Sequence, residues 1–254
     1  MIDIHCHILP EVDDGPGTIE ESLEMAREAV REGIKTIIAT PHHKNNKYEN
    51  SKGKIIANVN TLNSILSKEN IPLEILPGQE NRIYGEILED YKKGEILTLS
   101  NTKYLFIEFP SASVPRYAER LLYDIQIEGL IPVIVHPERN KELLGNPSIL
   151  YEMVKNGSLT QVTAASLAGY FGKTIKNFSI QLIEHNLTHF LASDAHNTTS
   201  RSFKLNEAYS LVEEKFGLDY YYMFNENSES LLLDDTIIKE IPEPIKRKKV
   251  FGIF

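Results

Sequence analysis

The segment IDIHCH at residues 2–7 predicts a short β-strand that ends in two histidines, His5 and His7. Side chains alternate between the two faces of a strand, so both imidazoles are expected on one side and Cys6 on the other. A single His-x-His motif is common and means little alone. In this chain, however, similar strand-like segments recur roughly every thirty residues, and almost every one ends in a side chain that can bind a metal.

Helical patterns separate these strand-like segments. The expected strands are residues 2–7, 34–39, 73–76, 104–109, 131–135, 159–162 and 189–192. The expected helices are residues 18–33, 53–68, 83–92, 116–128, 147–155, 173–185 and 203–216. Strands that alternate with helices of this length indicate βαβ units, a parallel sheet and the α/β class. Seven such units would nearly close a barrel.

The whole chain, residues 1–254, is predicted to form one domain. Barrels of the α/β class often reach this length as single domains, and no shift in composition marks a linker. The character of the sequence changes at about residue 225, where we expect a C-terminal tail. The basic run Lys246–Lys249 in that tail is expected to be solvated, with contact to an acidic partner as the alternative.

The composition excludes several classes of partner. A formal net charge of −9 argues against binding of nucleic acid or anionic membranes through the surface as a whole. No apolar stretch is long enough for membrane insertion, and no leader pattern opens the sequence. The single cysteine, Cys6, cannot form an intramolecular disulfide, which fits a reducing compartment. A cytoplasmic protein is therefore expected.

Nine imidazoles and carboxylates lie at or near the strand ends, and these ends would converge on one face of a barrel. They are His5, His7, Asp14, His42, Glu80, Glu108, His136, Asp194 and His196. Any one of them alone would more often cap a helix or lie on the surface. Glu108 and His136, however, have apolar neighbours, where a charge is costly unless it is paired or metal-bound. Together the nine residues predict one multi-metal centre, and so a hydrolase.

The ligand set also indicates the number and kind of metal ions. Nine ligands are too many for one ion, and two or three divalent ions with bridging carboxylates are expected. Four carboxylates with three divalent ions would leave about two positive charges, which suits a phosphate dianion. Mixed oxygen and nitrogen ligands favour Mn²⁺, Mg²⁺, Fe or Zn²⁺ over a thiolate-binding metal.

Two arginines strengthen the phosphate interpretation. Arg139 follows His136 by three residues, and Arg201 lies just past the Asp194-Ala-His196 motif. A guanidinium can fork onto phosphate oxygens, although for Arg201 an ion pair with a helix carboxylate is an equal alternative. A cationic rim or a merely solvated loop is expected from four lysines: Lys44, Lys47, Lys52 and Lys54.

The ordered motifs resemble those of the polymerase and histidinol phosphatase (PHP) superfamily. The motifs are Asp3-Ile-His5-Cys-His7, Asp13-Asp14-Gly15, Thr40-Pro41-His42-His43, Gly78-Gln-Glu80, Glu108-Phe-Pro110, His136-Pro-Glu-Arg139 and Ser193-Asp194-Ala-His196. Within the superfamily, the chain is similar to the bacterial manganese-dependent tyrosine-protein phosphatases encoded with capsule or exopolysaccharide genes. The resemblance runs from residue 1 to the C-terminal region. The set of motifs is specific, although no single motif is.

The resemblance implies a distorted seven-stranded (β/α)7 barrel, similar to a TIM barrel, with three metal ions at its C-terminal face. By residue, it implies one ion on His5, His7, Glu80 and Asp194, a second on Glu80, Glu108 and His136, and a third on Asp14, His42 and His196. Some members have histidine in place of Asp14 and Glu108. Oxygen ligands at these positions favour Mn²⁺ or Mg²⁺ over Zn²⁺.

The activity implied by the resemblance is hydrolysis of phosphotyrosine on proteins by a metal-activated hydroxide. Arg139 and Arg201 would bind the substrate phosphate. His42 or His196, or an acid such as Glu108, would assist the leaving group. The implied partner is an autophosphorylating bacterial tyrosine kinase that regulates capsule or exopolysaccharide synthesis.

Other functions fit the sequence less well. A cysteine-based tyrosine phosphatase needs Cys-x5-Arg, and Val12 stands where Cys6 would require arginine. A metal-dependent amidohydrolase commonly needs a bridging lysine after the fourth strand, where Glu108 stands. A PHP phosphatase of a small phosphorylated metabolite remains an alternative, whereas the acidic surface disfavours a nuclease. A non-catalytic phosphotyrosine-binding module is disfavoured by the intact ligand set.

Overall fold

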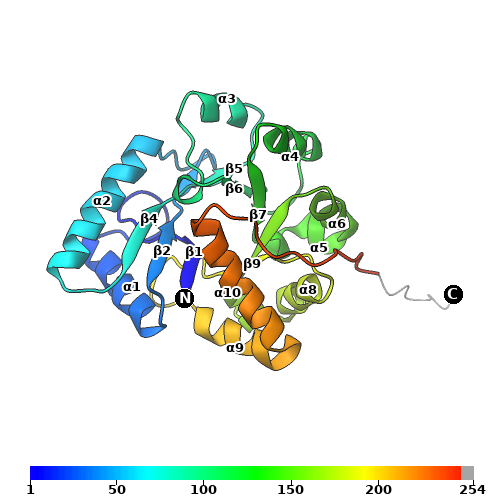
Figure 1. The fold of residues 1–254 in the computed structure, drawn as a ribbon. Helices are drawn as coiled ribbons and strands as arrows, with labels where there is room; N and C mark the ends of the chain where they lie inside the picture. Colours follow the sequence, from blue (N-terminus) through cyan, green and yellow to red (C-terminus); the bar gives the residue numbers. More distant parts are fainter. Residues whose placement is uncertain (247–254) are drawn as a thin grey trace.

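Parallel strands form the centre of the molecule, and helices surround them (Figure 1). The computed structural model describes residues 1–246. The strands are β1 (Ile2–Cys6), β2 (Thr36–Ala39), β3 (His42–His43), β4 (Glu74–Pro77), β5 (Glu80–Arg82), β6 (Tyr104–Glu108), β7 (Ile131–Val135), β8 (Leu159–Thr163) and β9 (Phe190–Ala192). The helices are α1 (Ile19–Arg31), α2 (Lys52–Lys68), α3 (Ile87–Lys92), α4 (Ala118–Ile127), α5 (Lys141–Gly145), α6 (Ser148–Lys155), α7 (Ala164–Ala168), α8 (Lys173–Glu184), α9 (Leu205–Phe216) and α10 (Leu218–Leu232). All seven expected strands and all seven expected helices form, although α3 is shorter than predicted.

The strands form two parallel sheets, one in the order β1-β2-β4 and one in the order β3-β5-β6-β7-β8-β9. This arrangement confirms the α/β class with parallel strands. The seven-stranded barrel is not confirmed, because the nine strands within residues 1–246 form two sheets that are not closed. The extra strands arise at two prolines: β2 ends just before Pro41 and β4 ends at Pro77, and the chain resumes as β3 and β5 in the other sheet. Proline cannot donate a ladder hydrogen bond, so it interrupts a strand.

The two sheets meet where β1 lies beside the end of β9. The His7 N–H donates to the carbonyl of Ala195 at 2.9 Å, and the Asp194 N–H donates to the carbonyl of His5 at 2.8 Å. These bonds join the first strand of the chain to the last. They bring the His-x-His motif and the Asp-Ala-His motif together although nearly 190 residues separate them.

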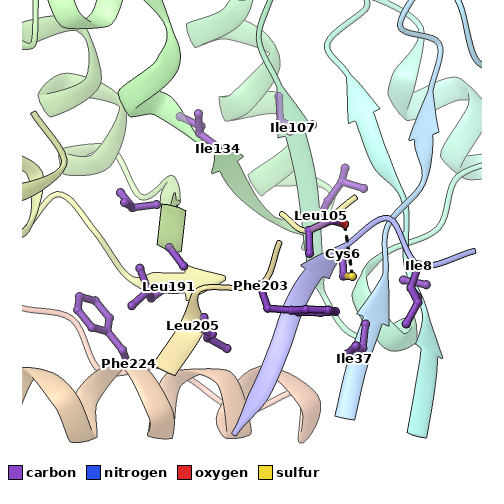
Figure 2. Close-up of a cluster of buried hydrophobic side chains, with 14 of the residues drawn as sticks. Cys6, Ile8, Ile37, Leu105, Ile107, Ile134, Leu191, Phe203, Leu205 and Phe224 are labelled. Carbon is purple, nitrogen blue, oxygen red and sulfur yellow. Dashed lines mark hydrogen bonds between the residues drawn. The ribbon is translucent and has the colours of Figure 1, made fainter. Parts of the chain in front are cut away.

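A shift in pairing register occurs within β1, of the kind that a β-bulge produces. As a result, Ile4 joins the buried cluster that contains Phe106, and the ring of His5 lies 5.0 Å from Phe106. Cys6 faces the opposite side, where its thiol donates to a backbone carbonyl at 3.5 Å (Figure 2). His5 therefore lies on the enclosed side and Cys6 on the helix side, as the alternation predicts.

Two buried apolar clusters pack on opposite faces of the strands. On β6, Tyr104 and Phe106 belong to the inner cluster, whereas Leu105 and Ile107 belong to the outer one, which packs against the helices (Figure 2). Burial of each such side chain stabilises the fold by about 1.5–3 kcal/mol. The inner cluster forms an apolar floor beneath the side chains at the strand ends.

The C-terminal segment closes the opposite end of this inner cluster. Helix α10 continues to Leu232, so the tail expected from about residue 225 begins later. Leu231 and Ile237 are buried in the inner cluster, and the backbone N–H of Lys103, just before β6, donates to Asp234 at 2.7 Å. Of the basic run, only Lys246 is described, and residues 247–249 lie outside the described residues. Within residues 1–246, no helix combines the length and the apolar character needed to cross a bilayer.

Candidate metal centre

Glu80, the first residue of β5, lies at the middle of a ring of imidazoles. Its carboxylate oxygens are 2.7 Å from His42 Nδ1, 2.7 Å from His136 Nε2, 3.2 Å from His7 Nε2 and 3.6 Å from His5 Nε2. The Glu80 side chain is fully buried. A buried carboxylate that faces four imidazoles, two from the end of β1, one from β3 and one from the end of β7, has the position of a bridging ligand.

Asp194 extends this ring on the side of β1. Its Oδ1 is 3.4 Å from His5 Nε2 and 3.3 Å from His7 Nε2, and its Oδ2 is 2.6 Å from Arg139. Asp194 has φ 52° and His136 has φ 36°, both in the left-handed region. Non-glycine residues seldom adopt this conformation, and such strain is concentrated at functional sites.

Asp14 lies between two imidazoles, at the edge of the ring that faces the solvent. Its Oδ1 is 3.3 Å from His196 Nε2 and 3.4 Å from His42 Nε2. Its Oδ2 accepts a hydrogen bond from Arg201 at 2.9 Å. The Asp14 side chain is 37% exposed, so this part of the ring faces the solvent.

Glu108, the last residue of β6, completes the set. Its carboxylate pairs with Arg82 at 3.1 Å and lies 3.8 Å from His42 Nδ1. Burial, together with the neighbouring charge of Glu80, raises the pKa of Glu108 to about 7. Ligand atoms of Glu108 and Glu80 lie within 4.8 Å of each other, and a cation or a proton between the two carboxylates would offset their repulsion.

The donor set fits divalent cations. Three groups have ligand atoms within 4.8 Å of one another: His7, Asp14, His42 and His196; His5, His7 and Glu80; and His42, Glu80 and Glu108. The buried atoms that lack a hydrogen-bond partner among the described residues include His5 Nε2, His7 Nε2, His42 Nδ1, Glu80 Oε2, Glu108 Oε2 and His196 Nε2. Polar atoms are costly to bury without partners, and these converge on one space.

The protonation of two histidines agrees with metal binding. Burial, followed by the charge of Arg139, lowers the pKa of His136 to about 3. Burial, followed by the charge of His7, lowers the pKa of His196 to about 4. Both imidazoles are thus neutral at pH 7, which is the form that ligates a metal.

All nine residues predicted as ligands therefore lie together, although the grouping differs from the implied one. His42 stands in the group with Glu80 and Glu108 as well as beside Asp14. His136 approaches Glu80 through one oxygen only. His42 belongs to two of these groups because of its place on the short strand β3. This strand pairs with β5 and so places His42 directly beside Glu80.

A cavity of about 320 Å³ opens above the ring. Arg139 and Arg201 both line it, next to apolar walls from Phe109, Val135 and Pro137. Each arginine is also paired with a carboxylate of the ring, and the partner of Arg201 is the loop residue Asp14 rather than the helix carboxylate that the sequence suggested.

Several residues that contact the ligands are not among the site residues predicted from the sequence. Asp13 and Gln161 contact the Nδ1 atoms of His7 and His5, and Arg82 pairs with Glu108. No local pattern marks Gln161, because residues 159–162 are the one expected strand whose end carries no candidate ligand. Of the predicted lysine rim, Lys44 is bound to Asp90 at 2.5 Å, whereas Lys47 is exposed.

Comparison with known proteins agrees with this geometry. Residues 1–233 match the family described as "Capsular polysaccharide synthesis, CpsB/CapC". The chain is 55% identical to the tyrosine-protein phosphatase YwqE of Bacillus subtilis over 254 residues, the full length of both. It is 34% identical to the tyrosine-protein phosphatase CpsB of Streptococcus agalactiae over 238 residues, which are 91% of this chain and 98% of the relative.

The fold is similar to a solved structure described under "YwqE from Bacillus subtilis and CpsB from Streptococcus pneumoniae, unique metal-dependent tyrosine phosphatases". The TM-score is 0.95 at 55% identity, over 97% of this chain and 100% of the other. The match spans the ring of imidazoles and carboxylates at the strand ends. The chain therefore belongs to the CpsB/CapC family of capsular polysaccharide synthesis.

Proposed function

We propose that the chain is a metal-dependent protein-tyrosine phosphatase. The observation that carries this proposal is the ring around Glu80, where ligand-type residues gather beneath a cavity that two arginines and five of the nine predicted ligands line. Full-length relatives that are named tyrosine-protein phosphatases support the same activity. The two arginines argue for an anionic substrate and so against the amidohydrolase alternative.

The proposed ligands are the nine predicted residues, from His5 to His196. Divalent cations bound by them would lower the pKa of a coordinated water and neutralise phosphoryl charge. Arg139 and Arg201 line the cavity, and their N–H groups would hold the phosphoryl oxygens as negative charge moves onto them. His42 and His196 turn Nε2 towards Asp14, so we assign both to cation binding rather than to protonation of the leaving group.

The cavity walls support an aryl phosphate as substrate. Phe109, Val135 and Pro137 form an apolar side that would pack against a phenyl ring, while the arginines hold the phosphate. A tyrosinate ion, with a pKa of about 10, leaves more easily than the alkoxide of serine. This chemistry requires no strong general acid and favours phosphotyrosine over phosphoserine.

We further propose Mn²⁺ as the physiological metal, because Asp14 and Glu108 add oxygen ligands to the imidazoles. Membership of a capsular polysaccharide family supports an autophosphorylating tyrosine kinase of that process as the partner. The single buried cysteine supports a cytoplasmic location. The continuous packing of β1 against β9 supports one domain for residues 1–246.

Hydrolysis of a phosphotyrosine peptide and of the matching phosphoserine peptide, in Mn²⁺ or in excess EDTA, tests the proposal. We expect turnover of the phosphotyrosine peptide only, and loss of turnover in EDTA. Asp194→Asn should lower the rate at least about 100-fold. Full activity in EDTA, or in the Asp194 variant, would contradict the assigned function.

A further inference from the structure

Asp13 is buried beneath the ring and makes three hydrogen bonds. Its Oδ2 lies 2.7 Å from His7 Nδ1 and accepts from the backbone N–H of His42 at 3.0 Å. Its Oδ1 accepts from the backbone N–H of Gly15 at 2.9 Å. The Asp13 side chain is fully buried, whereas its neighbour Asp14 is partly exposed and faces the cavity.

The pattern of donors around Asp13 can be satisfied only by a carboxylate. Two of its partners are backbone N–H groups, which cannot accept a hydrogen bond. Each carboxylate oxygen therefore has to accept. An asparagine at this position would turn its NH₂ towards at least one N–H group in either orientation, so one donor would face another.

The backbone around Asp13 is built to hold this arrangement. A Cβ atom on Gly15 would lie 2.2 Å from the carbonyl oxygen of His7, so only glycine allows the loop to fold back onto the end of β1. This close approach places the Asp13 carboxylate under the imidazole of His7. It also links that imidazole to the backbone of His42, which belongs to another sheet.

An ionised acceptor at Nδ1 decides which nitrogen of His7 carries the proton. Nδ1 must donate to Asp13, so a neutral His7 would have only Nε2 free to bind a cation, on the side where Glu80 and Asp194 lie at 3.2 and 3.3 Å. His5 has the same orientation but a neutral partner, Gln161, whose Oε1 is 2.8 Å from Nδ1. A carboxylate raises the basicity of an imidazole ligand, whereas an amide only orients it.

We infer that Asp13 is a positioning residue that holds the proton of His7 on Nδ1 and strengthens Nε2 as a metal ligand. The Asp13-Asp14 pair thus divides two tasks: Asp14 binds cations at the mouth, and Asp13 acts from behind through His7. This inference rests on the metal centre of the proposed function. It assigns no substrate contact to Asp13.

Metal affinity of the purified protein tests the inference directly. Mn²⁺ binding by Asp13→Asn should be about 10- to 100-fold weaker than in the parent, measured by competition with a chelator. Asp124→Asn is a matched control, because Asp124 lies on α4 in an exposed pair with Arg120. Turnover by the Asp13 variant should recover as Mn²⁺ is raised. Unchanged Mn²⁺ affinity in a folded Asp13 variant would overturn the inference.

A second measurement uses the unmodified chain, so it holds even when the variant does not fold. In Zn²⁺-loaded protein labelled with ¹⁵N at histidine, the spectrum should show the His7 proton on Nδ1 and a metal-type shift at Nε2. A proton on Nε2 of His7 would overturn the inference. A parent that binds Mn²⁺ but does not hydrolyse phosphotyrosine would refute the proposed function and leave both measurements valid.

Discussion

Replacing Glu80 with glutamine removes the one negative charge that faces four imidazoles. The change keeps the size of the side chain, so it tests charge rather than packing. Two of the three ligand groups contain Glu80, and the third, around Asp14, does not. We therefore expect Glu80→Gln to lose cations from two groups and to retain weak binding at the third.

The size of this effect follows from linkage. An ion present at about 100 times its Kd stabilises the folded state by ~2.7 kcal/mol. For a chain of this length, 1 kcal/mol shifts Tm by about 2 °C, so each ion is worth about 5 °C. The parent should gain about 15 °C from three ions, and Glu80→Gln about 5 °C.

Thermal unfolding in Mn²⁺ and in EDTA measures both shifts. In EDTA, the variant should be less stable than the parent: burial opposes ionisation of Glu80, but the charges of His42 and His5 hold its pKa well below the usual range, and glutamine loses this attraction. Glu184→Gln, on the exposed surface of α8, is the control and should retain the full shift. A Glu80 variant that keeps the whole Mn²⁺-dependent shift would refute the bridging role.

Three further predictions concern catalysis, pH and packing. Arg139→Ala should lower kcat for p-nitrophenyl phosphate about 100-fold or more, because N–H donors to the phosphoryl oxygens are lost. Arg120 is exposed on α4, so the control variant Arg120→Ala should keep parental kinetics. Burial lowers the pKa of His189 from 6.5 to about 3, so its contribution to stability is complete above pH 6.5 and falls as the pH drops towards 3. Urea unfolding should therefore show the parent losing up to about 1.4 kcal/mol per pH unit relative to His189→Asn, and parallel pH profiles would disprove this. Leu231→Ala should lower the free energy of unfolding by about 2–5 kcal/mol, because it leaves a cavity in the inner cluster, and it should not change Mn²⁺ affinity. A Tm equal to that of the parent would show that α10 does not close the inner cluster.

The seven main strands and the ligand set are accessible to sequence reasoning because both follow local rules. Apolar runs such as Ile131–Val135 predict buried strands wherever they occur. In a parallel α/β fold, the residue just beyond such a run lies on the functional face, so His136 and Glu80 can be selected without knowing the fold in detail. The resemblance to a known family further predicts which of these residues would bind the same ion.

Strand pairing across the chain is a property of the tertiary structure. Beyond Pro41 and Pro77 the chain forms two strands that were not predicted, β3 and β5, and no local preference reveals that they pair in a different sheet from β2 and β4. The C-terminal segment also depends on tertiary packing. Polar residues near 225 suggest a tail, yet Leu231 and Ile237 are buried, because they cover the end of the inner cluster that the strands leave open.

The residues that orient the ligands depend on the same long-range contacts. Gln161 meets His5 across 156 residues, and neither side chain has a local feature that indicates the other. Asp13 stands next to a ligand in sequence, but its role appears only when the turn at Gly15 places it under His7. Sequence alone determines which side chains can bind a metal, since that is a matter of chemical type and strand position. Folding decides which nitrogen of each imidazole is free, because a tautomer is set by whatever neighbour the chain brings to the other side of the ring.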